Sequence, residues 1–312
     1  MATIYVLGSI NMDLVFEMDR LPKKGETLKG KGFMMNPGGK GANQAVAASL
    51  QGVRTYMVGS LGDDALSDTL ESSLANYHVD TTHIQRIKGT PAGVAGILLE
   101  GGDNRIVIEA GANAVHDKKR IESILNAAGQ DAILIAQLEI PIDHVVHAFK
   151  IAKEKGLTTY LNAAPAAPVP SALYKDTDVL VINESEAEVL SGIAVTSKKT
   201  ALEAADILMG KGVKAVLFTL GKEGALYADK DGLHESKGFT VDVKDTTAAG
   251  DTFLGVYAAE RSEGVSVPDA LATANAAAAL TVSQKGAQKA IPTKTAVQNF
   301  LKAPKDKENC ND

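Results

Sequence analysis

The sequence predicts an α/β fold: a mostly parallel sheet with helices on both faces, plus a small antiparallel sheet that projects from it. Three observations predict this fold. Short apolar runs bounded by Gly, Asn or Pro recur along the chain, and amphipathic helical patterns separate most of them. Two further segments are strand-like on both sides of a turn, with no helix between. Fully apolar strands are typical of parallel sheets that helices cover on both sides.

In chain order, the elements alternate as such a sheet requires. The predicted strands of the main sheet are residues 4–7, 56–58, 132–135, 159–161, 179–182 and 215–218, followed by 225–228. The predicted helices between them are residues 42–50, 65–77, 118–128, 142–155 and 200–211. The last part of the chain is predicted to be mainly helical, over residues 251–262, 268–282 and 294–301.

The two exceptions to the alternation predict the projecting sheet. Residues 11–18 and 28–35 flank a turn at Gly25-Glu26, and residues 94–99 and 105–109 flank a Gly-Gly-Asp-Asn tip. These strands, at about 11–37 and 93–110, are insertions in one domain of residues 1–312 that ends in a polar tail, 303–312. One face of such a sheet needs cover from a bound ligand or a partner subunit.

Composition excludes several classes of protein. The chain has 312 residues, a formal net charge of −6, 45% hydrophobic and 22% charged residues, which is ordinary for a globular protein. The negative charge argues against nucleic-acid and anionic-membrane partners. The single cysteine, Cys310, permits neither an internal disulfide nor a thiolate metal site. With no basic region before residues 4–7 and no apolar run of ~18 residues, we expect no signal peptide, no membrane span and a cytoplasmic protein.

Two glycine-rich or small-residue motifs follow predicted strands, where open parallel sheets bind ligands. Gly-Gly-Lys-Gly-Ala-Asn-Gln (38–44) opens a helix, and its glycines allow close backbone approach while Lys40 and Asn43 supply donors. Asp-Thr-Thr-Ala-Ala-Gly-Asp (245–251) also leads into a helix, whose exposed N–H groups suit a phosphate anion. Asp251 there suits a general base, although an inert N-capping Asp is the common alternative.

Two weaker motifs follow the next strands. Asn183 and Glu186 are three residues apart, so one helix face could present both to Mg²⁺ or phosphate; an ordinary acidic helix start explains the spacing equally well. The segment 219–224, Thr-Leu-Gly-Lys-Glu-Gly, either lets a flat ring lie against the backbone or only makes a turn. No Gly-x-Gly-x-x-Gly fingerprint follows a strand, which argues against a nicotinamide-dependent oxidoreductase.

Together these motifs resemble the ribokinase family of carbohydrate kinases, from Val6–Asp13 to Lys285–Gln288, nearly the whole chain. Residues 38–43 look like the first signature of the family and 245–251 like its second, in the expected order. The resemblance implies a Rossmann-like fold in which the projecting strands form a lid that closes over the sugar and can pair with a second subunit. It also implies ATP-dependent phosphorylation of a sugar, closest to members that act on D-ribose at the 5-hydroxyl.

The resemblance also implies roles for individual residues. Asp251 would be the general base, and the anion hole for the transferring phosphoryl would be Ala248, Ala249 and Gly250. The sugar-binding set would be Asn11, Met12, Asp13, Gly39, Lys40, Gly41, Ala42, Asn43, Glu139 and Asp251. The set around ATP and Mg²⁺ would be Asn183, Glu186, Thr219, Leu220, Gly221, Lys222, Glu223, Gly224, Gly250, Asp251 and Asn275. An activating K⁺ would be held, mostly through backbone carbonyls, by Asp245, Thr247, Thr281, Gln284, Gly286 and Ala290.

Two departures from the family pattern and three alternatives accompany this interpretation. Ala248 replaces the commoner Gly, and Ala290 replaces a Ser that would add a side-chain contact to K⁺. The sugar could instead be deoxyribose or fructose, or the substrate a nucleoside, although 4% aromatic residues leave few rings for stacking on a base. The alternative from another class is a catalytically silent sugar-binding protein on this fold, against which the intact Asp251 argues.

Overall fold

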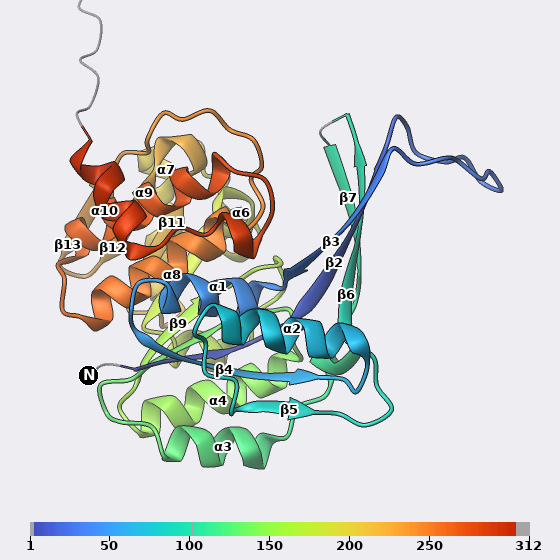
Figure 1. Ribbon diagram of the computed structural model, residues 1–312. Coiled ribbons are helices and arrows are strands. Elements are labelled where there is room, and N and C mark those ends of the chain that lie inside the picture. Colours follow the sequence, from blue (N-terminus) through green and yellow to red (C-terminus); the bar gives the residue numbers. More distant parts are fainter. Residues whose placement is uncertain (1–2, 102, 304–312) are drawn as a thin grey trace, which may run out of the picture.

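The computed structural model describes residues 3–101 and 103–303. It confirms the predicted α/β architecture, with a nine-stranded main sheet and a separate four-stranded sheet (Figure 1). Cys310, the residues before Thr3 and the predicted polar tail beyond residue 303 lie outside the described residues. Within the described part of the chain, no helix is both long and apolar enough to cross a membrane.

The main sheet places the N-terminal strand near its middle. Its strand order is β13-β12-β11-β10-β9-β8-β1-β4-β5, parallel from β5 to β11 and antiparallel from there to β13. The strands are β1 Thr3–Leu7, β4 Arg54–Leu61, β5 Ile84–Arg86, β8 Ile133–Ala136, β9 Thr158–Asn162, β10 Val179–Asn183, β11 Ala215–Thr219, β12 Ala225–Asp229 and β13 Gly232–Ser236.

Helices cover both faces of this sheet, as the apolar strands predict. On one face lie α1 Lys40–Ser49, α2 Ala65–Asn76, α8 Ala249–Ser262, α9 Val267–Val282 and α10 Lys294–Lys302. On the other lie α3 Lys118–Asn126, α4 Ile142–Glu154, α5 Ser171–Lys175, α6 Glu184–Ser191 and α7 Lys198–Gly210. Strand residues alternate between the two cores: Ile4 and Val6 face the first, and Tyr5 and Leu7 face the second.

The second sheet projects from the body beside α2 (Figure 1), and we call it the lid sheet. It consists of β2 Asn11–Met18, β3 Gly32–Gly38, β6 Gly93–Glu100 and β7 Asp103–Glu109, in the order β3-β2-β6-β7. The outer pairs are antiparallel as predicted, but the central pair, β2 and β6, is parallel. Both central strands leave the main sheet in the same direction, so their pairing is parallel.

The second lid strand begins later than predicted. Residues 28–31 are not in a strand, and β3 runs instead from Gly32 to Gly38, directly into the glycine motif. Consequently α1 begins at Lys40, two residues before its predicted start. The lid therefore joins the start of α1 without a loop of its own.

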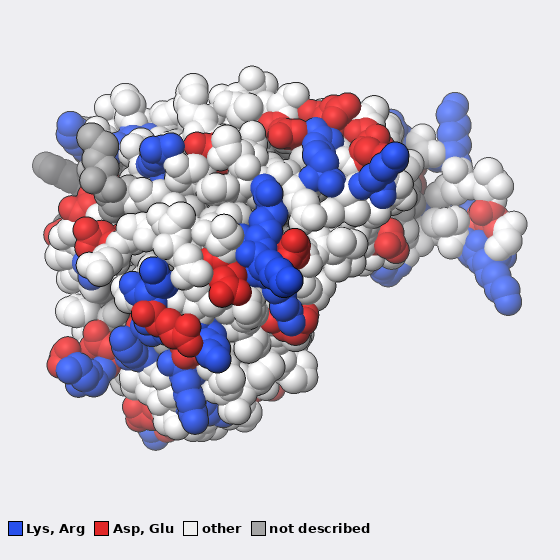
Figure 2. All heavy atoms as spheres, turned by 90° about the horizontal axis from the view of Figure 1, so that it is seen from below, with Lys and Arg blue, Asp and Glu red and all other residues white. Residues whose placement is uncertain are grey.

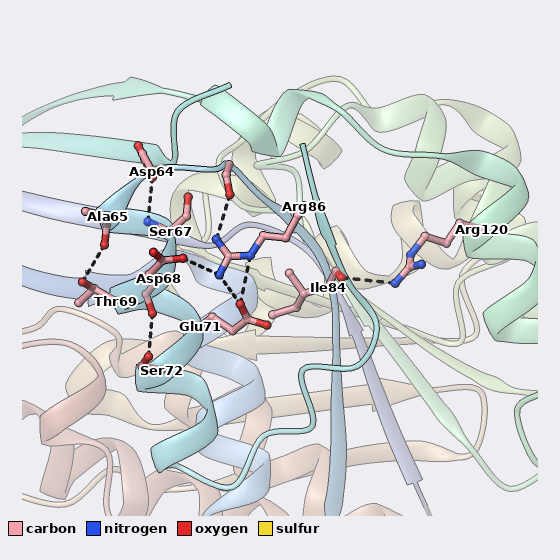
Figure 3. A network of polar contacts seen from close by, with 11 residues as sticks. Asp64, Ala65, Ser67, Asp68, Thr69, Glu71, Ser72, Ile84, Arg86 and Arg120 are labelled. Carbon is pink, nitrogen blue, oxygen red and sulfur yellow. Dashed lines mark hydrogen bonds and ion pairs between the residues drawn. The ribbon is translucent and has the colours of Figure 1, made fainter. Parts of the chain in front are cut away.

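A polar network anchors α2 to the edge of the main sheet (Figure 3). The Arg86 guanidinium contacts the carboxylates of Glu71 and Asp68 and donates to the Gly62 carbonyl at 2.9 Å. At the start of α2, Asp64 accepts from the Ser67 N–H at 2.8 Å. These charges also lie beside the short edge strand β5, which limits its pairing with other chains.

Positive and negative side chains are interspersed over the face drawn in Figure 2, while the segment that connects β2 and β3 extends beyond the body. The interspersed charges of this face are those of an ordinary globular surface. Elements that the sequence did not predict are the short α5 and the edge strands β5 and β13, whereas α6 begins at the acidic motif 183–188, where a helix start was expected.

Candidate active site

The start of α1 lies against the segment that follows β1. A Cβ on Gly41 would lie 2.7 Å from the Gly8 carbonyl carbon and from the Ser9 backbone nitrogen, so only glycine fits there. The Ala42 N–H donates to the Ser9 carbonyl at 2.9 Å. Gly39 has φ +90, which glycine adopts at no steric cost. The glycines of the motif thus place α1 at the carboxyl end of the parallel strands, where ligand sites are expected.

Helix α8 packs against α1 closely enough to bring the two signature motifs together. A Cβ on Gly255 would lie 2.5 Å from the Ala47 Cβ and 2.6 Å from the Gln44 carbonyl. At this distance Asn43 donates from Nδ2 to Asp251 Oδ2 at 3.0 Å, and Gln44 donates from Nε2 to Oδ1 at 2.9 Å. Asp251 is therefore a buried carboxylate, 6% exposed, with one amide donor on each oxygen.

The N-cap interpretation of Asp251 is wrong. The N-cap of α8 is Ala248, no side chain caps this helix end, and Asp251 lies within the first turn. Its carboxylate is held by α1 instead. The role of Asp251 as a general base stays a prediction.

Asn43 carries an acceptor that the described residues do not satisfy. Its Nδ2 faces the Asp251 carboxylate, which only accepts hydrogen bonds when ionised, so its Oδ1 points elsewhere. That Oδ1 is buried and without a hydrogen-bond partner among the residues that the structure describes. An unpaired buried acceptor costs free energy, and a ligand hydroxyl donating to it would recover that cost.

Two further carboxylates lie on the lid side of the site. Asp13, in β2, is 9% exposed, and the absence of a side chain at Gly38 makes room for its Oδ2. Glu139 accepts from the Ser9 hydroxyl at 2.5 Å and from the Lys40 N–H at 3.1 Å, both through Oε2. Burial, and then the charges of Glu139 and Asp251, raise the pKa of Asp13 to about 7.

The raised pKa of Asp13 predicts a pH-dependent stability. The folded state binds the Asp13 proton more tightly than the unfolded state, so this contribution is fully present below pH 3.8 and is lost as pH rises through about 7. The free energy of unfolding of Asp13→Asn minus that of wild type should therefore rise by up to a few kcal/mol from pH 4 to pH 8. Urea unfolding at several pH values measures it, with Glu17→Gln, from the exposed end of the same strand, as control. A gap that stays constant with pH would contradict the prediction.

Asn11 is oriented by a residue that the sequence analysis missed. Asn113, in the 3₁₀ turn Gly111–Ala114 at the base of the lid sheet, donates from Nδ2 to Asn11 Oδ1 at 2.7 Å. The same Nδ2 donates to the Ile10 carbonyl, and Asn113 Oδ1 accepts from the Ile10 N–H. Asn113 and Glu139 also line a cleft of about 300 Å³ between the lid and the body.

Lys40 supplies positive charge to this acidic site. The charge of Asp251 first, and those of Glu139 and Glu186 as well, raise the pKa of Lys40 despite its burial. Burial raises the pKa of Glu186, while the Asn183 N–H and the charge of Lys40 oppose that shift. The Glu186 carboxylate therefore lies close enough to Lys40 and Asp251 for their charges to affect its pKa.

Asn183 and Glu186 do not share a helix face as the spacing suggested. Asn183 is the N-cap of α6, and its Oδ1 accepts from the Glu186 N–H at 2.9 Å; Glu186 Oε2 accepts from the Asn183 N–H at 2.9 Å. This reciprocal pair is a capping box. It fixes the Glu186 carboxylate, 7% exposed, at the carboxyl end of β10.

The residues predicted to form the anion hole begin α8 with a strained backbone. Ala248 has φ 61, in the left-handed region, where a Cβ is unfavourable by roughly 1–2 kcal/mol. The Thr252 N–H donates to its carbonyl at 2.8 Å, which keeps the turn in place. Ala249 and Gly250 follow in the helix, so their N–H groups lie at its positive end.

Replacing Ala248 with glycine should stabilise the protein. Glycine adopts this φ without strain, and after its greater unfolded-state entropy is subtracted, Ala248→Gly should raise the free energy of unfolding by about 0.5–1 kcal/mol. Chemical denaturation measures this effect. The matched control is Ala249→Gly, in the right-handed helix, which should lower the free energy instead. Equal losses from both substitutions would rule out the strain at Ala248.

The segment predicted to contact the nucleotide contains a tight 3₁₀ turn. Residues Gly221–Glu223 form it, and the Leu220 N–H donates to the Gly224 carbonyl at 2.8 Å. Asn275, in α9, donates to the Ser236 carbonyl and hydroxyl, both at 3.0 Å. A Cβ on Gly224 would lie 2.1 Å from that same carbonyl, so the turn and the segment after β13 pack together. Thr219, at the end of β11, leads into this turn.

The predicted cation loop is brought together around Asp245. Its Oδ1 accepts from the Thr247 N–H and hydroxyl, at 2.9 and 2.6 Å, and its Oδ2 accepts from the Gly286 N–H at 2.9 Å. Burial acts to raise the pKa of Asp245, but these hydrogen bonds outweigh it and lower that pKa. The backbone N–H of Gln284 donates to the Thr281 carbonyl at 3.1 Å. Ala290, a few residues further along the chain, is buried.

Comparison with known proteins gives the class to which this fold and site belong. The chain belongs to the pfkB family of carbohydrate kinases, whose model matches residues 1–294. It is 38% identical over 300 residues to a ribokinase of Haemophilus influenzae, covering 96% of this chain and 98% of the relative. A deoxyribokinase of Salmonella typhi is 33% identical over 300 residues, covering 96% and 98%. The solved structure of Arabidopsis thaliana ribokinase complexed with ribose and ATP matches with a TM-score of 0.90 at 33% identity, covering 97% and 99%.

Proposed function

We propose that this carbohydrate kinase transfers the γ-phosphoryl group of ATP to the 5-hydroxyl of D-ribose, giving ribose 5-phosphate. The observation that carries the proposal is the pair formed by Asn43 and Asp251. One end of the Asn43 amide holds the carboxylate, and the other is a buried, unpaired acceptor suited to a sugar hydroxyl. The similarity to ribokinases and to the Arabidopsis complex with ribose and ATP supports this substrate pair.

The sugar would lie between the lid and the start of α1. Its hydroxyls would meet the polar groups already described and the backbone of the glycine motif, which comprise Asn11, Met12, Asp13, Gly39, Lys40, Gly41, Ala42, Asn43 and Glu139. Buried acceptors and donors of this kind discriminate strongly against analogues that lack a hydroxyl, because the protein group is then left unpaired. This favours D-ribose over deoxyribose.

Asp251 would take the proton of the attacking hydroxyl while the γ-phosphoryl moves in line. The positive end of α8, at Ala248, Ala249 and Gly250, would stabilise the charge on the transferring group. Positioning and charge stabilisation supply most of the catalysis in phosphoryl transfer. The adenine nucleotide would lie along residues 219–224 and Asn275, with Leu220, Lys222 and Glu223 contacting it from the turn.

The residues fit a magnesium ion that accompanies ATP. Mg²⁺ keeps several waters and is usually bound by substrate phosphates with one or two carboxylates. Among the described residues no cluster of three His, Cys, Asp or Glu side chains forms a metal cage. Glu186, fixed by its capping box next to the charges of Lys40 and Asp251, is the carboxylate that would orient the metal-bound phosphates. The metal would neutralise charge on those phosphates.

The loop around Asp245 fits a monovalent cation through backbone oxygen atoms. The Thr281 hydroxyl lies 3.0 Å from the Ala277 carbonyl and 3.1 Å from the Thr252 hydroxyl, so the hydroxyl is already hydrogen-bonded. The Thr281 carbonyl accepts from the Gln284 N–H and has a second lone pair that an ion could use. Ala290 can offer only its carbonyl, so we expect weak affinity. K⁺ at high concentration should raise kcat by ordering the start of α8, and equal rates in tetramethylammonium at matched ionic strength would contradict this.

The lid sheet exposes an apolar surface that we propose a second copy of the chain covers. Its exposed apolar residues are Phe16, Phe33, Met34, Met35, Ile106, Val107 and Ile108. The strand register places Phe16, Phe33, Met35 and Val107 on one face of the sheet and the other three on the opposite face. Exposed apolar side chains on one face of a projecting sheet are typical of an interface, and we propose the face that carries Val107. The homodimer is tested by analytical ultracentrifugation of the wild type and of Val107→Lys, at a residue 72% exposed. A wild type that is monomeric at micromolar concentration would overturn the proposal.

The function is tested by measuring ATP consumption with pentoses, hexoses and nucleosides. We expect the highest kcat/KM with D-ribose, well above 2-deoxyribose and fructose; a winning hexose, deoxyribose or nucleoside would replace D-ribose as the substrate. Binding of ribose without ATP consumption would favour the catalytically silent sugar-binding protein. The cytoplasmic location stays a prediction.

A further inference from the structure

Three amide side chains that were not among the predicted site residues, two of them fully buried, lead from the main sheet to Asp251. Gln137, the residue after β8, donates from Nε2 to Gln44 Oε1 at 2.6 Å. Gln44 in turn donates from Nε2 to Asp251 Oδ1 at 2.9 Å and to Asn162 Oδ1 at 3.1 Å. Gln44 and Gln137 are both 0% exposed. This series of hydrogen bonds, from Gln137 through Gln44, therefore ends on Oδ1 of Asp251.

The direction of these hydrogen bonds is fixed by a backbone group. Asn162, the last residue of β9, donates from Nδ2 to the Val181 carbonyl at 3.2 Å, and a carbonyl can only accept. The Asn162 oxygen must then face Gln44, which requires the Gln44 nitrogen on that side. The same nitrogen carries a second hydrogen, and Asp251 lies in its direction. The Gln44 oxygen is left for the Gln137 donor, so all the amide contacts agree.

The Gln137 side chain occupies space that is available only because residue 8 is a glycine. A Cβ on Gly8, at the end of β1, would lie 1.9 Å from Gln137 Oε1. That Oε1 is buried and unpaired among the described residues, which is an unfavourable state for an amide. The Gln137 side chain thus leaves its Oε1 unsatisfied, while its Nε2 donates to Gln44.

We propose that Gln44, oriented by Asn162 and Gln137, is a positioning residue that holds the Asp251 carboxylate in one rotamer and in its anionic form. The proposal rests on the proposed function, in which Asp251 takes the proton of the sugar hydroxyl. A donor on Oδ1 stabilises the anion, and a reversed amide would place two acceptors against each other. The hydrogen-bonded amide also restricts rotation of the carboxylate, which leaves it aimed at the substrate.

Other charged groups face Asp251 from the neighbouring elements and stay unchanged in the test. They are Lys40 of α1, Glu186 of α6 and Asp13 of β2, with Glu139 facing Asp13 and Lys40. Any change of pH dependence that follows a substitution at Gln44 alone therefore reports the lost amide.

The test replaces Gln44 with methionine, which keeps the length of the side chain and removes the donor. We expect kcat to fall about 10-fold, the acid limb of the kcat profile to move to higher pH, and both KM values to stay within about threefold. Gln44→Glu keeps the shape but places a second carboxylate against Asp251, so its acid limb should move further. In the Asp251→Asn background, Gln44→Met should have no further effect on the residual rate.

The matched control is Gln51→Met. Gln51 is also a buried glutamine, 1% exposed, and donates to the Pro292 carbonyl at 3.2 Å, away from Asp251. It should lower the melting temperature as Gln44→Met does but leave kcat and the acid limb unchanged. If Gln44→Met lowers only the melting temperature, as this control does, the positioning role is overturned. Should Gln44→Met fail to fold, Asn162→Leu tests the same role with a smaller expected shift.

A readout without catalysis separates this proposal from the proposed function. The ¹³C carboxyl signal of Asp251, assigned by its absence in Asp251→Asn, should shift and broaden in Gln44→Met relative to wild type, because the carboxylate loses the donor on Oδ1 and its fixed rotamer. If that shift occurs in a protein that does not phosphorylate ribose, the proposed function fails and the positioning role stands. An unchanged signal would overturn the positioning role.

Discussion

Asp251→Asn should lower kcat by ~10²–10⁴-fold while ribose and ATP still bind with Kd values near wild type. The substitution keeps the size of the side chain but removes the group assigned to take the hydroxyl proton. Because Ala248, not Asp251, is the N-cap of α8, loss of helix capping would not explain such a fall.

Steady-state kinetics with D-ribose and calorimetric binding of each substrate measure the two halves of this expectation. Thermal unfolding serves as the control, since the Asn43 and Gln44 donors that now meet a carboxylate would meet an amide in the variant. A folded variant whose kcat stays within about threefold of wild type would remove Asp251 from the mechanism.

Lys40→Met should lower kcat/KM by ~10²–10³-fold, the size of effect seen when one charged or hydrogen-bonding group that stabilises a transition state is lost. The charges of Asp251, Glu139 and Glu186 all act on Lys40 in the structure. Without its positive charge these carboxylates face one another and the incoming ATP phosphates, which raises the energy of both substrate binding and transfer.

Lys40→Arg separates the charge from the shape of this side chain. Arginine keeps the positive charge but is bulkier and binds through a planar fork, so it should restore part of the activity. Kinetics of both variants with D-ribose and ATP measure the effect. Equal activities for the methionine and arginine variants would show that the charge of Lys40 plays no part.

The sequence predicted the layered architecture because its signals are local. Apolar strands such as residues 179–182 and helical patterns such as 142–155 can be recognised within one window of residues. The lid was harder to predict, because β2 pairs with β6, a strand 75 or more residues further along the chain. No turn connects those two strands, so local patterns could not give the parallel direction of their pairing.

The signature residues were also predictable, but the residues that orient them were not. Asn43 and Asp251 occur in recognisable motifs, whereas Gln137, Asn162 and Asn113 are single polar residues with no spacing that marks them. Their common signal is position: Gln137 follows β8 and Asn162 ends β9, at the edge of the sheet that also holds the site. The capping box at Asn183 and Glu186 did have a sequence signature, an Asn followed three residues later by Glu.

The packing of α8 against α1 has a consequence for the synthesis of the protein. The hydrogen bonds from Asn43 and Gln44 to Asp251 join residues separated by 208 and 207 positions. At roughly 5–20 residues per second, a ribosome adds that stretch in about 10–40 s. The rest of the lid and of the main sheet is added during that time, whereas the proposed base and anion hole come only at its end, at residues 248–251. On the proposed function, the reactive centre can therefore form only after every strand of the described chain has been translated.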